Sequence, residues 1–554
     1  MSSADPKAEF IDAAVWHGSL ERADAILAEH PEIAASDIYV AAILADDAAV
    51  RGFLAADPRS ATAKGGAKGW DALTYLCFSK YLRLDPARSD AFLRAATALL
   101  DAGASANTGF ENLGHGPKPA LETVLYGAAG VAHHPEMTRL LIDRGADPND
   151  GEVAYHTPET LDNRAMKVLV ESGKLTPESM IWLLVRKLNW HDDEGVAWLL
   201  DHGADPNFLA PWGNRPLHHA LQNGVPISYF ERFLDHGADP TLPDKEGKSS
   251  FALAARMARA DVLELFEKRG FSAELQGDDA FLAGCTRADE ATARRLIAED
   301  PGLIQRIQSQ NGAALVDFAG SGNTAALALL LDLGFDVASA RTAPKWLEGE
   351  TALHVAAGRG LLPIAKLLIE RGAPLEAKNA RGRTPLAVSI RCFEEQSEWT
   401  PNESTPAIAQ ALIDAGANLE SAGMTLAAAV CLGRTADQAR LASSDAKERQ
   451  KALAAAAYYA IASAVPMLVT LGADPNACNL GLHPHATALH NAVCSGSLET
   501  VKALVAAGAE VDQKDRAYQA SPLSWAEYFV REKRDPPKRD AEIAAYLRGL
   551  TKIT

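Results

Sequence analysis

Residues 349–390 read GETALHVAAGRGLLPIAKLLIERGAPLEAKNARGRTPLAVSI, and this stretch contains one complete structural unit and the start of the next. Thr351 is placed to cap a short helix, because its hydroxyl can accept an unpaired N–H group of the first turn. A second helix follows, with an apolar stripe that includes Ile364. Gly372 then lies where a left-handed C-cap is needed. The pattern begins again at Thr384, about 33 residues after the first cap.

A two-helix hairpin of this size cannot bury its apolar face alone, so it must stack on copies of itself. The local sequence resembles the ankyrin-repeat consensus at both ends of the hairpin. First helices match in TALHVAA (351–357), RTPLAVS (383–389), RPLHHAL (215–221) and TALHNAV (487–493). Second helices end in RGADPN (144–149), HGADPN (202–207), HGADPT (236–241), LGADPN (471–476) and AGAEVD (507–512). The resemblance implies an all-α ankyrin-repeat solenoid whose hairpins are joined by short β-hairpin-like fingers.

The spacing of these ends predicts repeats over nearly the whole chain, without a second domain. A split into two lobes near 274–310 or 420–450 stays open, because weak repeats can interrupt the stack. We expect atypical N-terminal repeats as a cap (1–64), repeats (65–273), a diverged repeat (274–310), repeats with an insertion at about 392–404 (311–420), further repeats (421–515) and C-terminal capping helices (516–554).

Composition narrows the classes of partner. The formal net charge is −18 and no run of Lys or Arg stands out, which argues against nucleic acid or an anionic membrane surface as the main partner. The most apolar stretch, 452–469, is interrupted by polar residues and a proline, so it predicts two repeat helices instead of a membrane span. The six cysteines are scattered without a C-x-x-C pair, and no secretory signal is visible. We therefore expect a cytoplasmic monomer with buried free thiols.

Histidines are the candidate metal ligands. The resemblance implies that His218, His354 and His490 tie their own first turns to neighbouring backbone or to the cap hydroxyl. A second group lies in the turns between helices and could bind a metal together with Asp192, Asp193 and Glu194; it comprises His17, His133, His134 and His191. The competing interpretation is that Asp192 is an N-cap, and no spacing places ligands on one face. We predict no metal, no cofactor and no catalytic residue.

Aromatic residues in the fingers are the candidate protein-binding residues. Each lies between the glycine cap of one repeat and the first helix of the next: Phe110, Tyr155, Phe208, Trp212, Trp346 and Tyr518. In the family that the sequence resembles, finger tips and inner helices form the concave surface on which partners bind, and exposed aromatic residues are favoured binding hot spots. For Trp212 and Trp346 packing on a neighbouring finger is the alternative. The insertion at 392–404, with Phe393 and Trp399, is a further candidate.

The predicted function is a non-catalytic scaffold that binds a protein partner, of neutral or basic surface, on the concave face. The alternative is an enzyme or a small-molecule or metal-binding protein. It would use a pocket at the irregular repeats, near 133–134 and 191–194 or around 390–460, because a pure scaffold needs fewer departures from the consensus.

Overall fold

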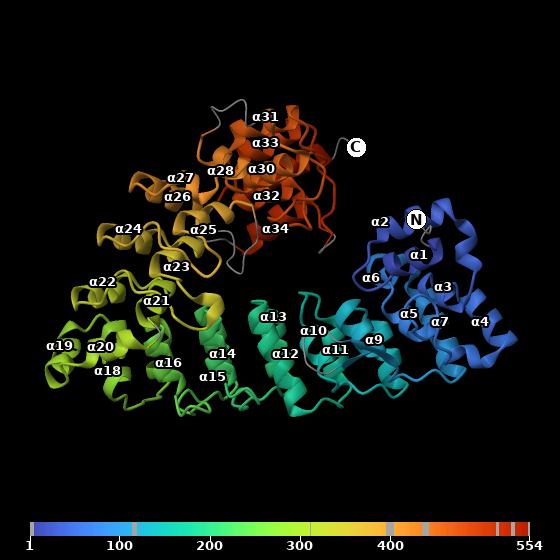
Figure 1. Cartoon of the computed structure of the whole chain (residues 1–554), viewed down its shortest axis with the longest axis horizontal. Helices are drawn as coiled ribbons and strands as arrows, with labels where there is room; N and C mark the ends of the chain where they lie inside the picture. The colour runs from blue at the N-terminus through green and yellow to red at the C-terminus, as the bar shows by residue number, and fades with distance from the viewer. Residues whose placement is uncertain are drawn as a thin grey trace. The chain divides into compact units, whose positions relative to one another are not determined.

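The computed structural model describes residues 5–112, 119–310, 312–394, 404–434, 443–516, 520–532 and 538–551. The chain divides into two compact units (Figure 1). One consists of Met1–Leu253 with Glu264–Ala273, and the other of Ala254–Leu263 with Glu274–Thr554. Each unit is a stack of helix pairs of the predicted kind, and the finer division into six segments stays a prediction.

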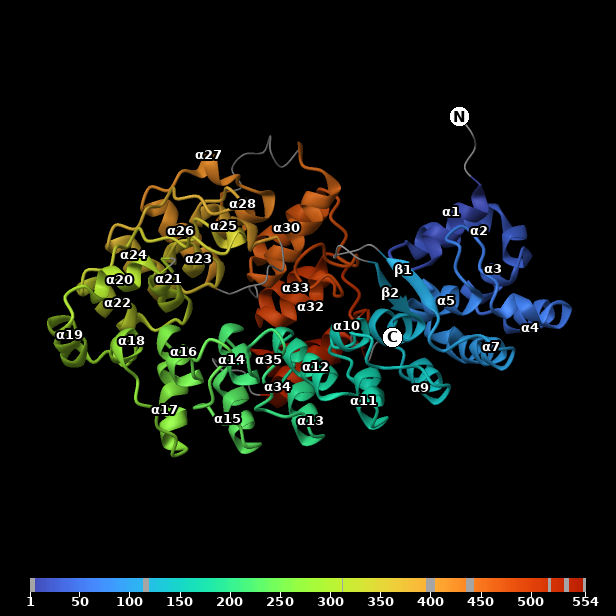
Figure 2. The same cartoon turned by 60° about the horizontal axis from the view of Figure 1, so that its bottom comes forward.

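The N-terminal unit has a row of first helices and a row of second helices, visible side by side in Figure 2. The first helices are α1 (Pro6–Ala14), α3 (Ile38–Ile43), α5 (Ala72–Cys77), α8 (Val124–Tyr126) with the π-helical η4 (Gly127–Val131), α10 (Glu152–His156), α12 (Pro177–Asn189) and α14 (Pro216–Gln222). The second helices are α2 (Leu20–Glu29), α4 (Asp47–Ala56), α6 (Lys80–Leu84) with α7 (Ser89–Asp101), α9 (Pro135–Asp143), α11 (Arg164–Glu171), α13 (Asp193–Asp201) and α15 (Ile227–Asp235).

The C-terminal unit repeats this plan, and Figure 1 shows α28, α30, α32 and α34 one after another. Its first helices are α18 (Gly277–Thr286), α21 (Ala313–Gly320), α23 (Ala352–Gly358), α25 (Pro385–Arg391), α28 (Leu426–Cys431), α30 (Ala446–Tyr458), α32 (Ala488–Ser495) and α34 (Pro522–Glu532). The others are α19 (Glu290–Glu299), α20 (Leu303–Ser309), α22 (Thr324–Asp332), α24 (Leu362–Glu370), α26 (Thr405–Asp414), α27 (Leu419–Ala422), α31 (Val465–Thr470), α33 (Leu498–Ala506) and α35 (Asp540–Thr551). Helices α16 (Ser250–Arg256) and α17 (Ala260–Lys268) complete the chain between the two stacks.

The predicted helix ends are confirmed. Gly203, Gly237, Gly372 and Gly508 have φ angles of 91°, 82°, 79° and 95°, and each follows the second helix of its repeat. L side chains rarely adopt this left-handed conformation, which is why glycine recurs there. At the N-terminal ends, the Thr351 hydroxyl accepts the backbone N–H of His354, as predicted.

The histidines of the first helices have the role that the resemblance implied. His354 Nδ1 lies 2.8 Å from Thr351 Oγ1, and His354 Nε2 lies 2.9 Å from the carbonyl oxygen of Arg383 in the next finger. His490 makes the equivalent pair of contacts, and His218 Nε2 lies 2.8 Å from a backbone carbonyl oxygen. Burial lowers the pKa of all three rings, so they are neutral and join one repeat to the next.

The asparagine that ends the GADPN motif ties each finger to the following repeat. Asn207 Nδ2 donates to the carbonyl oxygen of Gly237, and Asn207 Oδ1 accepts the N–H of Asp239, both at 2.8 Å. Asn107 and Asn476 make the same two contacts with the glycine caps that follow them. We call this pair of contacts the asparagine clamp. It satisfies a carbonyl that the helix end leaves without a partner.

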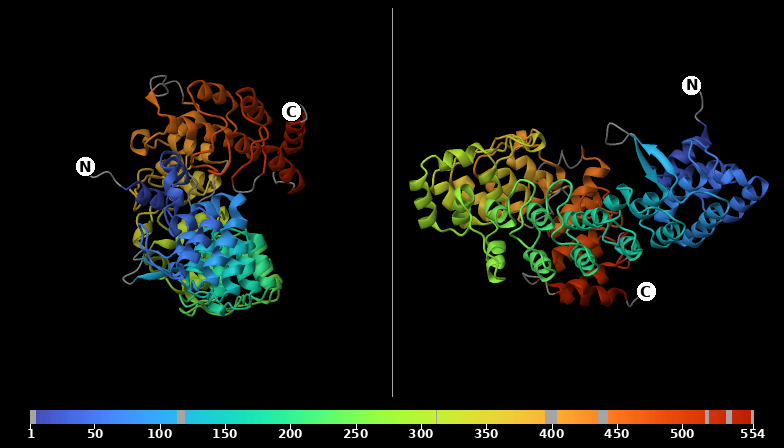
Figure 3. Two further views of the ribbon diagram at one scale, coloured as in Figure 1. Left: turned by 90° about the vertical axis from the view of Figure 1, so that its right-hand side faces the viewer. Right: turned by 90° about the horizontal axis from the view of Figure 1, so that it is seen from below.

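Strands occur where one finger is long enough to pair. Strand β1 (Gly109–Asn112) runs antiparallel to β2 (Ala120–Thr123), and this hairpin stands out from the helices (Figure 3, right). Shorter fingers carry isolated bridges, such as Ala340 with Thr351. The prediction of β-hairpin-like fingers on an otherwise helical chain is therefore confirmed.

The apolar stretch 452–469 divides as predicted, because α30 ends at Tyr458 and α31 begins at Val465. Among the helices of the described residues, none has the length and apolar character needed to cross a membrane. All six cysteines are free, but Cys478 and Cys494 are partly exposed, so the prediction of buried thiols holds only for the other four.

Candidate functional site

The predicted binding residues differ in exposure and in the elements that carry them. Phe110 is only 8% exposed, because it stacks on Trp70 in the core of the N-terminal repeats, so it is not an exposed binding residue. Tyr155 lies on helix α10 and not in a finger, which corrects its predicted position. Phe208 lies in its finger and is partly exposed. Tyr518 and most of the insertion, including Trp399, lie outside the described residues, and Phe393 is buried.

Two of the predicted residues meet around a third aromatic side chain. Trp212 packs on Trp182 of α12 with ring centroids 4.1 Å apart, so it is packed, but on a first helix and not on a neighbouring finger as the alternative had it. Trp182 in turn contacts Tyr155 edge to face at 5.3 Å. All three rings remain partly exposed. We call Tyr155, Trp182 and Trp212 the aromatic row; it crosses three consecutive repeats of the N-terminal unit.

Trp182 was missed by the sequence analysis, although α12 carries a signal that could have found it. Trp182, Arg186 and Asn189 recur at helical spacing on one face of α12, whereas Leu184 and Leu188 on another face are fully buried. An aromatic, a cationic and an amide side chain therefore project from the inner row of helices in line.

Arg186 lies beside the Tyr155 end of the aromatic row. Its guanidinium lies 4.1 Å from the centroid of the Tyr155 ring and pairs with Glu159. The side chain is 15% exposed, so this cation–π contact and this ion pair are partly shielded from water. Arg186 is thereby held in one position beside the aromatic rings.

His156 links Glu159 to the neighbouring repeat. Its Nδ1 lies 3.0 Å from Glu159 and its Nε2 lies 3.2 Å from Glu152. Burial lowers the pKa of His156, but the hydrogen bond and charge of Glu159, with the charge of Glu152, outweigh it and raise the pKa. The His156 ring also packs on Tyr126 at 5.2 Å.

A glycine in the π-helical turn makes room for this packing. A Cβ atom at Gly130 would lie 2.7 Å from the Tyr126 ring and 3.1 Å from His156 Cβ, so a larger residue would push both rings away. π-Helical turns inserted into helices occur frequently at functional sites. Here the turn adjoins the charged end of the aromatic row.

Amide side chains flank the other end of the row. The amide nitrogen of Asn189 faces α14. It lies 2.6 Å from His219 Nε2 and 3.1 Å from the carbonyl oxygen of Val185. Burial lowers the pKa of His219 to about 4, so the ring is neutral and can accept this hydrogen bond. Asn214 donates to Gln222 at 2.8 Å alongside. The inner face thus offers aromatic surface beside fixed hydrogen-bonding groups.

A serine–histidine pair in the same unit bears on the enzyme alternative. Ser89 Oγ lies 2.7 Å from His134 Nε2, a distance suited to nucleophile activation. However, His134 Nδ1 accepts the backbone N–H of Met137 as the N-cap of α9. Burial lowers the pKa of His134, so the ring is neutral and its proton is on Nε2, which donates to Ser89. A general base must accept the serine proton. Here the His134 ring donates its own proton to Ser89, so this pair cannot activate the serine as a nucleophile.

The three carboxylates proposed as metal ligands are paired with Lys187, Arg232 and Lys167, and His134 is held by Ser89 and Met137. Asp192 caps α13 by accepting the N–H of Gly195 at 2.8 Å, which confirms the competing interpretation. Its other oxygen pairs with the fully buried ammonium of Lys187 at 2.7 Å. Within the part of the chain that the structure describes, no group of three or more His, Cys, Asp and Glu residues is arranged to hold a metal ion.

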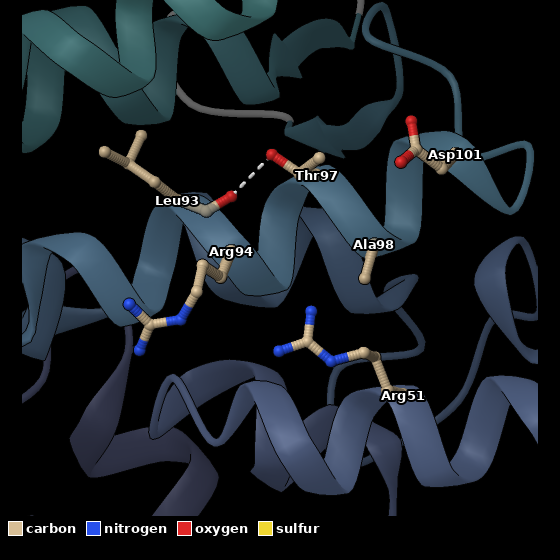
Figure 4. A pocket seen from close by; sticks show the side chains of 6 residues that line it. All are labelled: Arg51, Leu93, Arg94, Thr97, Ala98 and Asp101. Atoms are coloured by element: carbon tan, nitrogen blue, oxygen red, sulfur yellow. Dashed lines mark hydrogen bonds between the residues drawn. The ribbon is translucent and has the colours of Figure 1, made fainter.

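A hollow of about 420 Å³ lies on the second helices, between α4 and α7 (Figure 4). Two guanidinium groups from opposite helices face each other across it, those of Arg51 and Arg94. Both pair with the same carboxylate, that of Asp47, which neutralises one of the two positive charges. The hollow was not among the predicted sites.

The family profile described as "Ankyrin repeats (3 copies)" matches residues 182–279, 315–422 and 400–515, together more than half of the chain. This chain belongs to the ankyrin-repeat family. The matched residues include α12 from Trp182 onward and all of α14, and hence Trp182, Arg186 and Trp212 of the candidate site.

Curated relatives are also ankyrin-repeat proteins. The B-cell lymphoma 3 protein homolog of Mus musculus is 27% identical over 180 residues, which cover 31% of this chain and 39% of that protein. The ankyrin repeat and SAM domain-containing protein 6 of Danio rerio is 31% identical over 146 residues, covering 26% and 18%. The aligned regions thus span about two fifths or less of these relatives' own length. The solved ankyrin repeat domain of Bcl-3 aligns at 21% identity and a TM-score of 0.18, covering 37% of this chain and 92% of that one.

Proposed function

We propose that this ankyrin-repeat chain is a non-catalytic scaffold that binds a protein partner, and that the aromatic row on its inner helices is a contact surface. Membership of a family of typical protein-interaction modules supports the general function. The observation that carries the site is the contact of Trp212 with Trp182 and of Trp182 with Tyr155, beside Arg186.

The chemistry of these side chains suits a protein partner. Tryptophan, tyrosine and arginine are the residue types most enriched among binding hot spots. Rings that already pack on one another lose little conformational freedom on binding, so less of the interaction energy is spent on ordering them. The amides of Asn189 and Asn214 are carried on the same helix as Trp182 and the same finger as Trp212, and both are held by hydrogen bonds within the chain.

The remaining features of the proposal follow from composition. A net charge of −18 favours a partner of neutral or basic surface over nucleic acid. Six free cysteines support a reducing compartment such as the cytoplasm. We propose that the chain works there as a monomer without a cofactor.

The test is affinity capture with the tagged full chain and with Trp182→Ala, from lysate of cells that express it. We expect a stoichiometric protein partner on the wild-type chain and at least tenfold less of it on Trp182→Ala. Trp198→Ala is the matched control, because Trp198 stacks on His202 on the second-helix side of the same unit. A chain that captures no stoichiometric partner, or whose partner is retained equally by Trp182→Ala, would contradict the proposal.

A further inference from the structure

The finger between α22 and α23 presents an unusual side chain to solvent. Trp346, in the short η5 turn (Lys345–Leu347), is 72% exposed, more than the other exposed large hydrophobic residues in the described part of the chain. A tryptophan exposed to this extent forgoes the favourable free energy that burial of its apolar surface would provide. A solvent-exposed tryptophan is therefore a candidate anchor for a partner.

The base of this finger is firmly held. Arg341 N donates to the carbonyl oxygen of Glu350, and Gly349 N donates to that of Arg341, both at 2.9 Å. The Arg341 guanidinium pairs with Asp317 at 2.6 Å and with Glu350 at 3.2 Å, and these side chains are largely buried. Trp346 is thus carried on a fixed turn, although its own ring is free.

The neighbouring finger tip lies directly against this one. A Cβ atom at Gly349 would be 2.4 Å from the carbonyl oxygen of Lys378, so only glycine allows the two backbones this approach. The second tip is itself a tight turn, in which Asn379 N donates to the carbonyl oxygen of Arg383 at 3.0 Å. The two tips form one surface within the C-terminal unit.

The charge of this surface is opposite to that of the whole chain. Lys345, Lys378 and Arg381 are exposed on the two tips, and none of them has an ion-pair partner among the residues that the structure describes. Glu348 is the exposed carboxylate beside them, and Glu376 accepts hydrogen bonds from Asn418 and Ser421. A chain of net charge −18 therefore carries three unpaired cations on the two adjoining finger tips, one of which also carries the exposed tryptophan.

We propose that these two finger tips bind an acidic linear segment of a partner protein, with an apolar side chain of that segment packed on Trp346. The charge complementarity selects the partner: carboxylates meet Lys345, Lys378 and Arg381, whereas a basic segment is repelled. The proposal rests on the proposed function only in treating the chain as a protein-binding scaffold. Its site lies in the C-terminal unit, whereas the aromatic row lies in the N-terminal unit, and its partner is of opposite charge to the one expected there.

The test uses fluorescence anisotropy of labelled synthetic peptides with the full chain. The probes are an acidic peptide with one central tryptophan, the same peptide with glycine at the centre, and a lysine peptide with the central tryptophan. We expect the acidic tryptophan peptide to bind at least tenfold more tightly than either of the others, and to lose affinity as salt is raised, since the contact charges are exposed.

Variants locate the site. Trp346→Ala and Lys378→Glu should each weaken the acidic peptide at least fivefold. Lys366→Glu makes the same charge change on the exposed side of α24 in the same repeat and should leave binding within twofold. Trp182→Ala should also leave it unchanged, so the finger-tip site and the aromatic row can fail independently. Circular dichroism confirms that each variant is folded.

Three outcomes would overturn the proposal. In the first, the acidic peptide binds no more tightly than the lysine peptide. In the second, the acidic peptide binds the wild-type chain and Trp346→Ala equally tightly. Sedimentation could instead show that Trp346→Ala abolishes a self-association of the chain, which would assign the surface to a second copy.

Discussion

At the scale of single residues, His156 is the most closely surrounded ionisable group of the candidate site. Glu152 comes from its own helix and Glu159 from the turn that follows. Tyr126 faces it from α8, and Glu122 on β2 and Arg186 on α12 contribute charges nearby. The imidazolium form is therefore favoured in the folded chain, and it in turn holds Glu159 in place for Arg186.

The raised pKa of His156 predicts a pH-dependent contribution to stability. A group whose pKa is higher in the folded chain stabilises it fully below the unfolded value of about 6.5, and this contribution is lost as pH rises through the folded pKa. The difference in Tm between wild type and His156→Gln should therefore be largest near pH 5.5 and shrink above neutrality. His219→Gln is the control with the opposite sign: the pKa of His219 is depressed to about 4, so the wild type should lose stability relative to this variant as pH falls from about 6.5 towards 4.

A difference in Tm that grows between pH 6 and 9 for His156→Gln would contradict this prediction. Titration of the histidine ring resonances by NMR checks the cause directly. The resonance that is missing in His156→Gln should report a pKa above the ordinary histidine value of about 6.5.

Local sequence motifs predicted the role of a residue well where its side chain bonds to its own helix or to the next repeat. His354 and Asp192 are examples, because a cap and a first turn are only a few residues apart. Phe110 could not be placed in this way. It is buried by Trp16 and Trp70 from earlier repeats, and single-sequence patterns do not identify such distant contacts.

At the scale of helices and turns, the glycine caps decide where each repeat ends. Gly103 follows α7 with a φ angle of 100°, and a Cβ atom there would have open space around it. The cost of a side chain at this position is therefore backbone strain alone, of about 1–2 kcal/mol. Gly52 lies inside α4, which packs on α7, and it too has open space.

These two glycines give a matched prediction with opposite signs. Gly103→Ala should lower the free energy of unfolding by about 1 kcal/mol, because alanine disfavours the left-handed conformation. Gly52→Ala should raise it by about 0.5–1 kcal/mol, because alanine is the better helix former. Urea denaturation followed by circular dichroism measures both. If both substitutions shift stability in the same direction, backbone conformation is not what decides these sites.

Helix α10 shows where the sequence pattern failed. It has only five residues and begins after Gly151, which has a φ angle of 89°; Asp150 caps its first turn by accepting the N–H of Val153. So short a segment carries no helical apolar repeat, which is why the sequence pattern places Tyr155 in a finger. The neighbouring first helix α12 is long and begins with a threonine cap, yet Trp182 was overlooked there because its partners come from other repeats.

At the scale of the whole molecule, stability should be distributed along the chain instead of concentrated at one point. Each repeat packs on its neighbours in sequence, and the chain falls into two compact units. In such arrays stability is approximately a sum of the repeats' own stabilities and nearest-neighbour terms. A defect in one repeat should then be felt most strongly nearby.

Hydrogen exchange with mass spectrometry tests this distribution. Leu99 in α7 is fully buried, and Leu99→Ala should cost about 2–5 kcal/mol locally. Exchange should become faster in α4, α5 and α9, while residues 443–516 keep their wild-type protection. Leu453→Ala in α30 is the reciprocal control, with the effect expected in α28 and α32. Uniform acceleration over both units in either variant would show one cooperative structure instead.

The asparagine clamp has a consequence for how the length of such a chain can change over evolutionary time. Asn107, Asn207 and Asn476 each bond to the same two backbone atoms of the following unit. Duplication or loss of an entire stretch between two of these clamped seams would join ends that already fit, since the donor and acceptor presented at these three seams are alike. Loss of half of such a stretch would leave an amide without its carbonyl. Genes for chains of this kind can therefore lengthen or shorten in whole steps without new chemistry at the junctions.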